Sequence, residues 1–285
     1  MTATLVAQLI KQERLSWDTT LAEVFSDSSF KIHPDLRGVT VLHLVSHRSG
    51  LPANLDLTDY LGVNGGRERL RAVRQELAKP PENTPGSKYE YSNLGYVIVG
   101  SLVEKVTGKS WEKNMMEHVF RPLEMTSAGI GGIGTPGKVD QTWGHTADGQ
   151  PVPMNGPKVD NPPVMGPPGR VHCSIQDWSK YVADFLLGMS GKPALMPTAA
   201  YKKLSTPPFG GDYALGWIVT ERDWAGGMAL THSGSNTMNY ATVWIAPQKD
   251  FAILACTNQA GDAGAAACDA AVTALIEHHA ATAGE

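Results

Sequence analysis

The chain has 285 residues, of which 42% are hydrophobic and 18% are charged, so its composition is that of a folded globular protein with one large domain or two smaller ones. The formal net charge of −4 and the lack of a basic block argue against a nucleic-acid partner. No apolar run approaches the ~18 residues of a membrane span. The three cysteines are odd in number and lack metal-ligand spacing, so they imply neither a disulfide framework nor a zinc site. We also expect no other metal and no cofactor.

Residues 1–14 predict a helix that is already under way at residue 1 and that residues 15–20 close, because apolar residues recur at helical spacing with no cap or turn before them (Leu5, Val6, Leu9, Ile10). Residues 1–20 lack the basic region and apolar core of a signal peptide. A second short helix is expected to follow through Phe25.

Residues 39–52 predict a short helix that Thr40 caps and that ends at the breakers Gly50 and Pro52. His47 lies between two serines and could form a nucleophile–base pair with one of them. No third orienting group is near in sequence, so we favour a role in pinning the loop to its neighbours.

The next predicted helix covers residues 64–80 and is amphipathic, with Arg67 and Arg69 on a solvated face. Another helix is expected from Glu112 to Phe120.

Between these helices, a Pro-Gly turn leads into Tyr91, Ser92 and Asn93, directly before an apolar run at residues 96–103. This run predicts a buried helix. A phenol beside an amide can handle protons. The alternative, favoured for the tripeptide alone, is that Ser92 or Asn93 caps the helix.

The middle of the chain is rich in glycine and proline. Residues 132–139 nearly match a phosphate-binding loop, but Val139 replaces the metal-binding Ser or Thr and Pro136 removes a backbone donor, so we reject that interpretation. Residues 140–172 show little periodicity and favour the wall of a substrate cleft. A helix is predicted from Ser174 to Leu187.

The period then changes to that of strands, predicted at residues 213–219, 237–245 and 251–257, with a hairpin turn at residues 247–250. A closing helix is expected at residues 265–281, near whose end the cluster Glu277–His279 should be solvated rather than metal-binding.

This order of elements predicts an α/β fold of the α+β type, with an antiparallel sheet flanked by helices and a mainly helical region. We expect a single domain over residues 1–285. Its residues 1–205 would be mainly helical with the cleft wall, and residues 206–285 would hold the strands and closing helix.

Between two predicted strands lies a run of small residues after a histidine, Thr231 to Asn236. At a strand edge, such a run leaves backbone N–H groups open to an oxyanion or an extended substrate. The alternative is a tight turn with an exposed His232.

Together these segments resemble the serine β-lactamase-like family, which includes class C β-lactamases, penicillin-binding D-peptidases and β-lactamase-fold esterases. The resemblance covers essentially the whole chain and rests on motifs in a fixed order (Leu44, Ser46, His47, Ser49, Gly50, Leu51, Pro52; Pro85, Gly86; Tyr91, Ser92, Asn93, Gly95, Tyr96; Leu215, Gly216, Trp217; His232, Ser233, Gly234).

The resemblance implies a β-lactamase/transpeptidase-like fold and acyl transfer on a small ester, amide or peptide substrate. It implies that Tyr91 is the acylation base and that Asn93 orients the substrate. His232, Ser233 and Gly234 would form the Lys/His-x-Gly motif that binds substrate, and the N–H of Ser235 would supply half of the oxyanion hole.

The family's Ser-x-x-Lys motif, which carries the nucleophile, should open the first helix and is missing there. With the family's N-terminal strands also missing, we expect a chain that is short at its N-terminus and forms little acyl-enzyme as written. It would be periplasmic or secreted if a signal peptide precedes it, and cytoplasmic otherwise. The open sheet edge would favour a homodimer.

Two other interpretations remain open. The chain could be a non-catalytic binding module that keeps the cleft, or a hydrolase with a relocated nucleophile, for which Ser92 and Ser235 are the nearest candidates. His232 stands where β-lactamases usually carry Lys, and a neutral imidazole attracts a carboxylate less strongly. We therefore expect an esterase or D-peptidase rather than a β-lactamase.

Overall fold

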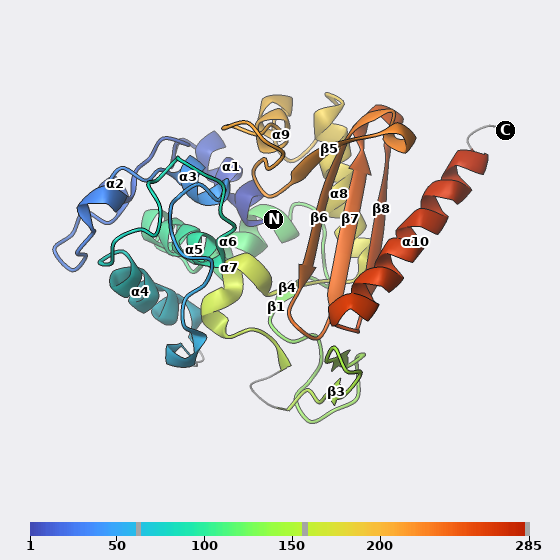
Figure 1. Ribbon diagram of the computed structural model, residues 1–285, viewed down its shortest axis with the longest axis horizontal. Helices are drawn as coiled ribbons and strands as arrows, with labels where there is room; N and C mark the ends of the chain where they lie inside the picture. The colour runs from blue at the N-terminus through green and yellow to red at the C-terminus, as the bar shows by residue number, and fades with distance from the viewer. Residues whose placement is uncertain (61–63, 156–158, 283–285) are drawn as a thin grey trace. The chain divides into compact units, whose positions relative to one another are not determined.

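The computed structural model describes residues 1–60, 64–155 and 159–282 (Figure 1). The chain forms two compact units, one made of Met1–Pro122 and Pro162–Val171, the other of Leu123–Asn161 and His172–Glu285. These bounds differ from the division expected near residue 205, because the helices that follow residue 172 belong with the strands. That all 285 residues form one domain stays a prediction.

The first unit is helical. Its helices are α1 (Thr2–Lys11), α2 (Leu21–Val24), α3 (Val41–Val45), α4 (Gly65–Glu76), α5 (Asn93–Thr107), α6 (Trp111–Met115) and α7 (Gly166–Gly169). Single 3-10 turns lie at Pro34–Leu36, Leu57–Asp59 and Pro163–Met165, and a π-helical turn, Met116–Phe120, continues α6.

Helix α5 is the centre of this unit, since it contacts α1, α2, α3, α4, α6 and α7. Its apolar run is buried from Val97 to Val103, as predicted, whereas Tyr96 at the start of the run is half-buried. Gly100 permits the close approach of α7, because a Cβ there would lie 2.2 Å from Cγ of Pro167 on α7. The helix ends at Gly108, whose left-handed φ of 70° suits glycine.

The predicted helices at the start of the chain are confirmed. Helix α1 begins at Thr2 without a side-chain cap, and Thr40 caps α3 through a hydrogen bond from the N–H of His43. The helix predicted at residues 64–80 is wrong at its end, because α4 stops at Glu76, and at one residue within it. Arg67 is exposed, but Arg69 has no exposed surface and belongs to the buried side of the helix.

The second unit contains a four-stranded antiparallel sheet with the order β5-β6-β7-β8. The strands are β5 (Ile218–Arg222), β6 (Gly227–Ser235), β7 (Tyr240–Ala246) and β8 (Phe251–Thr257), and the unit's helices are α8 (Ile175–Met189), α9 (Thr198–Leu204) and α10 (Gly261–Thr282). Short strands β1 (Gly129–Ile130), β2 (Gly144–His145) and β3 (Pro151–Val152) precede them, and β4 (Val171–His172) spans the boundary between the units.

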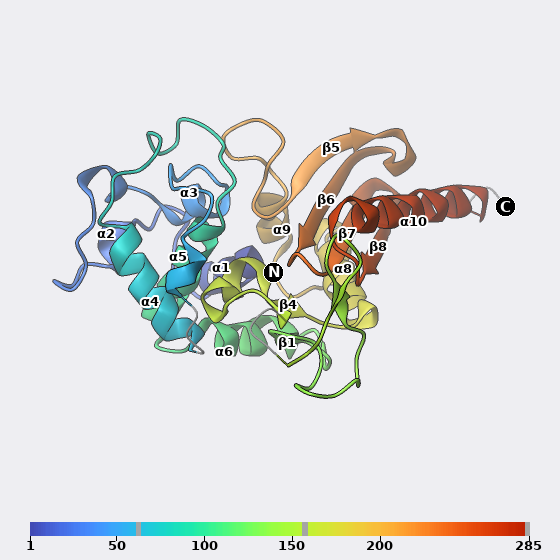
Figure 2. The same ribbon diagram turned by 60° about the horizontal axis from the view of Figure 1, so that its bottom comes forward.

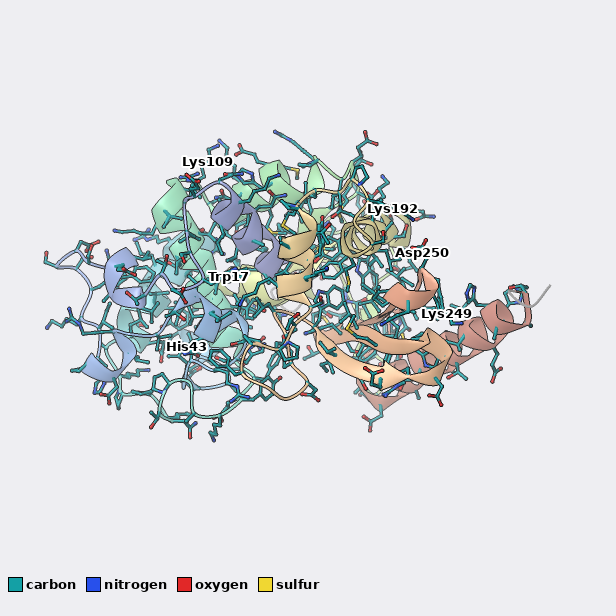
Figure 3. All side chains as sticks on the ribbon, turned by 90° about the horizontal axis from the view of Figure 1, so that it is seen from above. Trp17, His43, Lys109, Lys192, Lys249 and Asp250 are labelled. Atoms are coloured by element: carbon teal, nitrogen blue, oxygen red, sulfur yellow. The ribbon has the colours of Figure 1, made fainter. Side chains whose placement is uncertain are left out.

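Helix α10 packs against β7 and β8, and Figure 2 shows it running along the sheet. Cys268 and Val272 of α10 form a buried cluster with Ile253 and Ala255 of β8. A further aromatic group joins α8 and α9, because the ring centroid of Phe185 lies 5.2 Å from both Tyr201 and Trp217. The turn between β7 and β8 lies at Pro247–Asp250, as predicted, and Lys192 reaches Asp250 at 3.4 Å (Figure 3).

The predicted fold class is confirmed, with three corrections to its strands. The strand predicted at residues 237–245 begins only at Tyr240. The segment predicted as a strand at residues 213–219 becomes one only at Ile218. Thr231–Ser235, expected to lie between strands or in a tight turn, belongs to the longest strand of the sheet, β6.

Candidate functional site

The Tyr91–Asn93 segment lies where the chain enters α5, and Ser92 is the cap of that helix. The Ser92 hydroxyl accepts the N–H of Gly95 at 2.9 Å and donates to the carbonyl of Pro52 at 2.6 Å. The residue has no exposed surface. Ser92 is therefore a structural side chain, and its two neighbours are less buried than it is, Tyr91 being exposed and Asn93 half-buried.

Tyr91 is 42% exposed, and burial of the rest of the ring raises the pKa of its phenol. Asn93 is half-buried. Its amide group donates to Oδ1 of Asn54 at 2.8 Å, and its N–H donates to the carbonyl of Ala53 at 2.8 Å. A phenol and an oriented amide therefore flank the buried cap, and Asn54 is a supporting residue that no local sequence signal indicated.

His47 lies against the Tyr91 ring, and it pins the loop as expected. It is 1% exposed, and its ring centroid is 4.1 Å from that of Tyr91. Its Nδ1 accepts the N–H of Ser92 at 3.0 Å. Ser46, which the sequence offered as a partner, instead donates its hydroxyl to the carbonyl of Leu42 at 2.6 Å.

The second group of predicted residues, His232, Ser233, Gly234 and Ser235, lies at the C-terminal end of β6. All four pair with β7, from His232 opposite Val243 to Ser235 opposite Tyr240. In the described part of the chain, the pairing of β6 with β5 ends at Thr231 opposite Ile218. The end of β6 is therefore supported on one side only, and Ser233, Gly234 and Ser235 are exposed.

The two serine hydroxyls on this strand end are already engaged. Ser233 Oγ lies 2.8 Å from Thr242 Oγ1, and Ser235 donates to the carbonyl of Asn239 at 2.7 Å. His232 is half-buried, with its ring centroid 6.4 Å from that of Tyr213. Burial lowers the pKa of His232, so its imidazole is neutral at neutral pH.

The predicted site residues thus form two groups, each assembled by local structure. Tyr91 and Asn93 belong to the first unit, and His232, Ser233, Gly234 and Ser235 belong to the second.

Two Ser-x-x-Lys sequences occur within the chain, and neither opens α1. Ser28 and Lys31 lie exposed in the loop after α2. Ser110 caps α6, with its hydroxyl accepting the N–H of Lys113 at 3.2 Å, and both of these residues are exposed. Their spacing matches the motif, but their surroundings are those of a surface loop and an ordinary helix cap.

The other features considered from the sequence are a phosphate-binding loop, a metal site and a membrane span. Residues 132–139 are followed by irregular chain rather than by the helix that a phosphate-binding loop requires. Among residues 1–60, 64–155 and 159–282, no group of three His, Cys, Asp or Glu side chains is arranged to hold a metal ion. Within the same ranges, no helix combines the length and the apolar character needed to cross a membrane.

Comparison with known proteins places this geometry in context. A family model described as Beta-lactamase matches residues 1–277. Protein flp of Staphylococcus aureus (strain MW2) is 22% identical over 260 residues, covering 89% of this chain and 50% of that protein. Unguisins hydrolase ungD' of Aspergillus campestris is 25% identical over 286 residues, covering 93% of this chain and 50% of that protein.

Among solved structures, the octameric penicillin-binding protein homologue from Pyrococcus abyssi superposes with a TM-score of 0.77 at 24% identity, covering 97% of this chain and 64% of that chain. This likeness shows the fold. The present chain spans about half the length of the curated relatives that it matches.

Proposed function

Because this chain belongs to the Beta-lactamase family, we propose that it is part of a serine hydrolase that transfers the acyl group of a small ester, amide or D-peptide substrate. The observation that carries the proposal is the arrangement at the start of α5, where a buried, hydrogen-bonded Ser92 lies between the exposed Tyr91 and the half-buried Asn93. A helix cap requires only one of these three polar residues, so the other two are available for chemistry.

In this proposal Tyr91 moves the proton of the nucleophile. A phenol is a useful base only as phenolate, and burial alone raises the pKa of Tyr91 in the wrong direction for this role. A neighbouring cation in the assembled site would have to offset the effect of burial. Asn93 orients the substrate, because its amide is already held by Asn54 at 2.8 Å.

The end of β6 binds the substrate backbone. Its open side, beyond the last β5 pair at Thr231, can accept an extended acyl chain by strand pairing. The N–H of Ser235 supplies one oxyanion donor.

The neutral His232 favours an ester or peptide over a β-lactam antibiotic, because a neutral imidazole is a weak partner for the antibiotic's carboxylate. The unguisins hydrolase relative supports hydrolysis as the reaction class.

The proposal assigns the nucleophile to none of the serines described above. Ser92, Ser233 and Ser235 have hydroxyls engaged in hydrogen bonds, and Ser110 caps α6. The test is to label the protein produced from its natural gene with a fluorophosphonate and to locate the adduct by peptide mass spectrometry. An adduct within residues 1–285 would assign a relocated nucleophile. No adduct, together with millimolar binding of a D-peptide, would favour a non-catalytic binding module.

The role of Tyr91 is tested by hydrolysis of p-nitrophenyl acetate and of a D-alanine p-nitroanilide. Tyr91→Phe should lower kcat by about 10²- to 10⁴-fold, the range for loss of a general acid–base group. Tyr89→Phe is a matched control, because Tyr89 is also 42% exposed and lies two residues away. It should leave kcat within about twofold. Equal losses in the two variants would remove Tyr91 from the mechanism.

A further inference from the structure

His47 is held in a backbone conformation that does not favour histidine. Its φ is 57°, in the left-handed region, directly after Ser46, the C-cap residue of α3. Glycine is the usual residue at such a position, where it ends a helix without strain. The imidazole is only 1% exposed, so its own interactions must offset the strain of this backbone conformation.

These interactions are made with Tyr91 and with the backbone on either side of it. The two peptide N–H groups on either side of Tyr91 both donate to His47: the N–H of Glu90 to its carbonyl at 2.8 Å, and the N–H of Ser92 to its Nδ1 at 3.0 Å. The imidazole also packs on the Tyr91 ring, with centroids 4.1 Å apart and planes inclined by 34°. His47 thus fixes the backbone before and after Tyr91, and the ring between.

The hydrogen bond from Ser92 defines the chemical form of the imidazole. A backbone N–H can donate only to a ring nitrogen that carries no proton, so Nδ1 is bare and the proton of the neutral ring is on Nε2. Ser92 has no exposed surface, so water cannot replace the acceptor without opening the loop.

We infer that His47, as its neutral Nε2–H tautomer, is the positioning residue of Tyr91. It does not touch the substrate; it sets the place of the phenol through the Ser92 N–H and the stacked ring. Its role in turnover rests on the proposed function, whereas its tautomer and its hold on Ser92 do not.

Two variants distinguish the loss of the hydrogen-bond acceptor from the relief of backbone strain. Asparagine and glycine both tolerate a left-handed φ, and both remove the aromatic ring. His47→Asn keeps an acceptor one bond from Cγ, as Nδ1 is, whereas His47→Gly has none. We expect His47→Gly to raise the hydrogen-exchange rate of the Ser92 amide by about tenfold or more, the effect of losing one buried hydrogen bond. His47→Asn should restore most of the protection.

In the turnover assay, His47→Gly should lower kcat by about tenfold or more with little change in KM, and His47→Asn should recover part of the loss. The control is His43→Gln, at a half-buried histidine on α3 whose Nδ1 lies 3.0 Å from the Thr40 hydroxyl. It should leave kcat and Ser92 exchange unchanged.

The tautomer itself is read from the wild-type protein by long-range ¹⁵N–¹H NMR, with the His47 signals identified by their loss in His47→Asn. A protonated Nδ1 would overturn the inference, as would equal Ser92 exchange in the glycine and asparagine variants. If the wild type shows no turnover, the proposed function fails, while the NMR and exchange results still decide the role of His47.

Discussion

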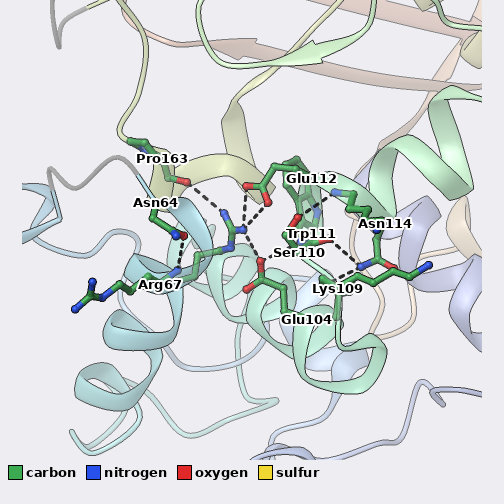
Figure 4. A network of polar contacts seen from close by, with 12 residues as sticks. Asn64, Arg67, Glu104, Lys109, Ser110, Trp111, Glu112, Asn114 and Pro163 are labelled. Carbon is green, nitrogen blue, oxygen red and sulfur yellow. Dashed lines mark hydrogen bonds and ion pairs between the residues drawn. The ribbon is translucent and has the colours of Figure 1, made fainter.

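Arg69 and Glu104 form an ion pair at 2.5 Å in which the arginine side chain has no exposed surface (Figure 4). A second carboxylate, Glu112, lies 2.9 Å from the same guanidinium nitrogen, and the carbonyl of Pro163 accepts from the other. Glu104 also accepts the N–H of Trp111 at 3.0 Å, so the arginine joins α4, α5 and α6.

Replacing this arginine should destabilise the first unit strongly. Arg69→Met leaves Glu104 and Glu112 without their common cation, and breaking a buried pair in this way costs about 3–5 kcal/mol of unfolding free energy. Urea unfolding followed by circular dichroism measures the loss. Arg67→Met is the control, because Arg67 is exposed on the same helix and points away from the network (Figure 4). It should change the free energy by less than about 0.5 kcal/mol, and similar losses in both variants would contradict a special role for Arg69.

Gly100→Ala should destabilise the protein although alanine favours helix formation by about 1 kcal/mol over glycine. The added Cβ would lie 2.2 Å from Cγ and 3.1 Å from Cβ of Pro167, and a proline ring cannot rotate away. Overpacking of this kind costs about 1–3 kcal/mol, so we expect a net loss of unfolding free energy. Gly38→Ala has no atom within 4 Å of its new Cβ and should be neutral. A higher urea midpoint for Gly100→Ala would show that α5 and α7 can separate at no cost.

Ser92→Ala and Ser110→Ala compare two serine caps. Each should lower the unfolding free energy by about 1 kcal/mol, and Ser92→Ala by more, because it also leaves the carbonyl of Pro52 without its donor. Only Ser92→Ala should lower kcat, since Ser92 holds Tyr91 and Asn93 in place. If Ser110→Ala abolished labelling by a fluorophosphonate, the nucleophile would be Ser110 and our assignment would be wrong.

Tyr201 should make the protein sensitive to alkali. Burial, and then the hydrogen bond from its hydroxyl to Asp184 at 2.5 Å, raise the pKa of Tyr201 far above its ordinary value. In the unfolded chain the phenol titrates near pH 10, while the folded protein retains its proton. The stabilisation is therefore complete below pH 10 and decreases above it, by up to about 1.4 kcal/mol per pH unit.

Urea midpoints measured from pH 8 to 11.5 would show this slope, and Tyr201→Phe should reduce it. Tyr89→Phe, at an exposed tyrosine, should keep the wild-type slope. An unchanged slope in Tyr201→Phe would place the alkaline transition elsewhere.

Local signals predicted much of the fold. The apolar run of α5, the caps at Thr40 and Ser92 and the turn at Pro247–Asp250 all depend on residues a few positions apart, and periodicity and turn chemistry report such relations.

Relations between distant residues were missed. Arg69 looked like any charge on a surface helix, because its partners lie 35 and 43 residues later in the chain. Asn54, which holds Asn93, lies 39 residues before it. No part of β6, Gly227–Ser235, was predicted as a strand. At its end, Ser-Gly-Ser has low strand propensity, which pairing with β7 overrides.

The composition of that strand end also bears on solubility. A strand that is paired on one side only can add a strand from another molecule, and hydrophobic edges of this kind lead to aggregation. Ser233, Gly234 and Ser235 offer backbone groups for pairing but no apolar side chain to make the pairing permanent. The same three residues therefore allow brief, reversible contacts at this edge and discourage the growth of an extended sheet between copies of the protein.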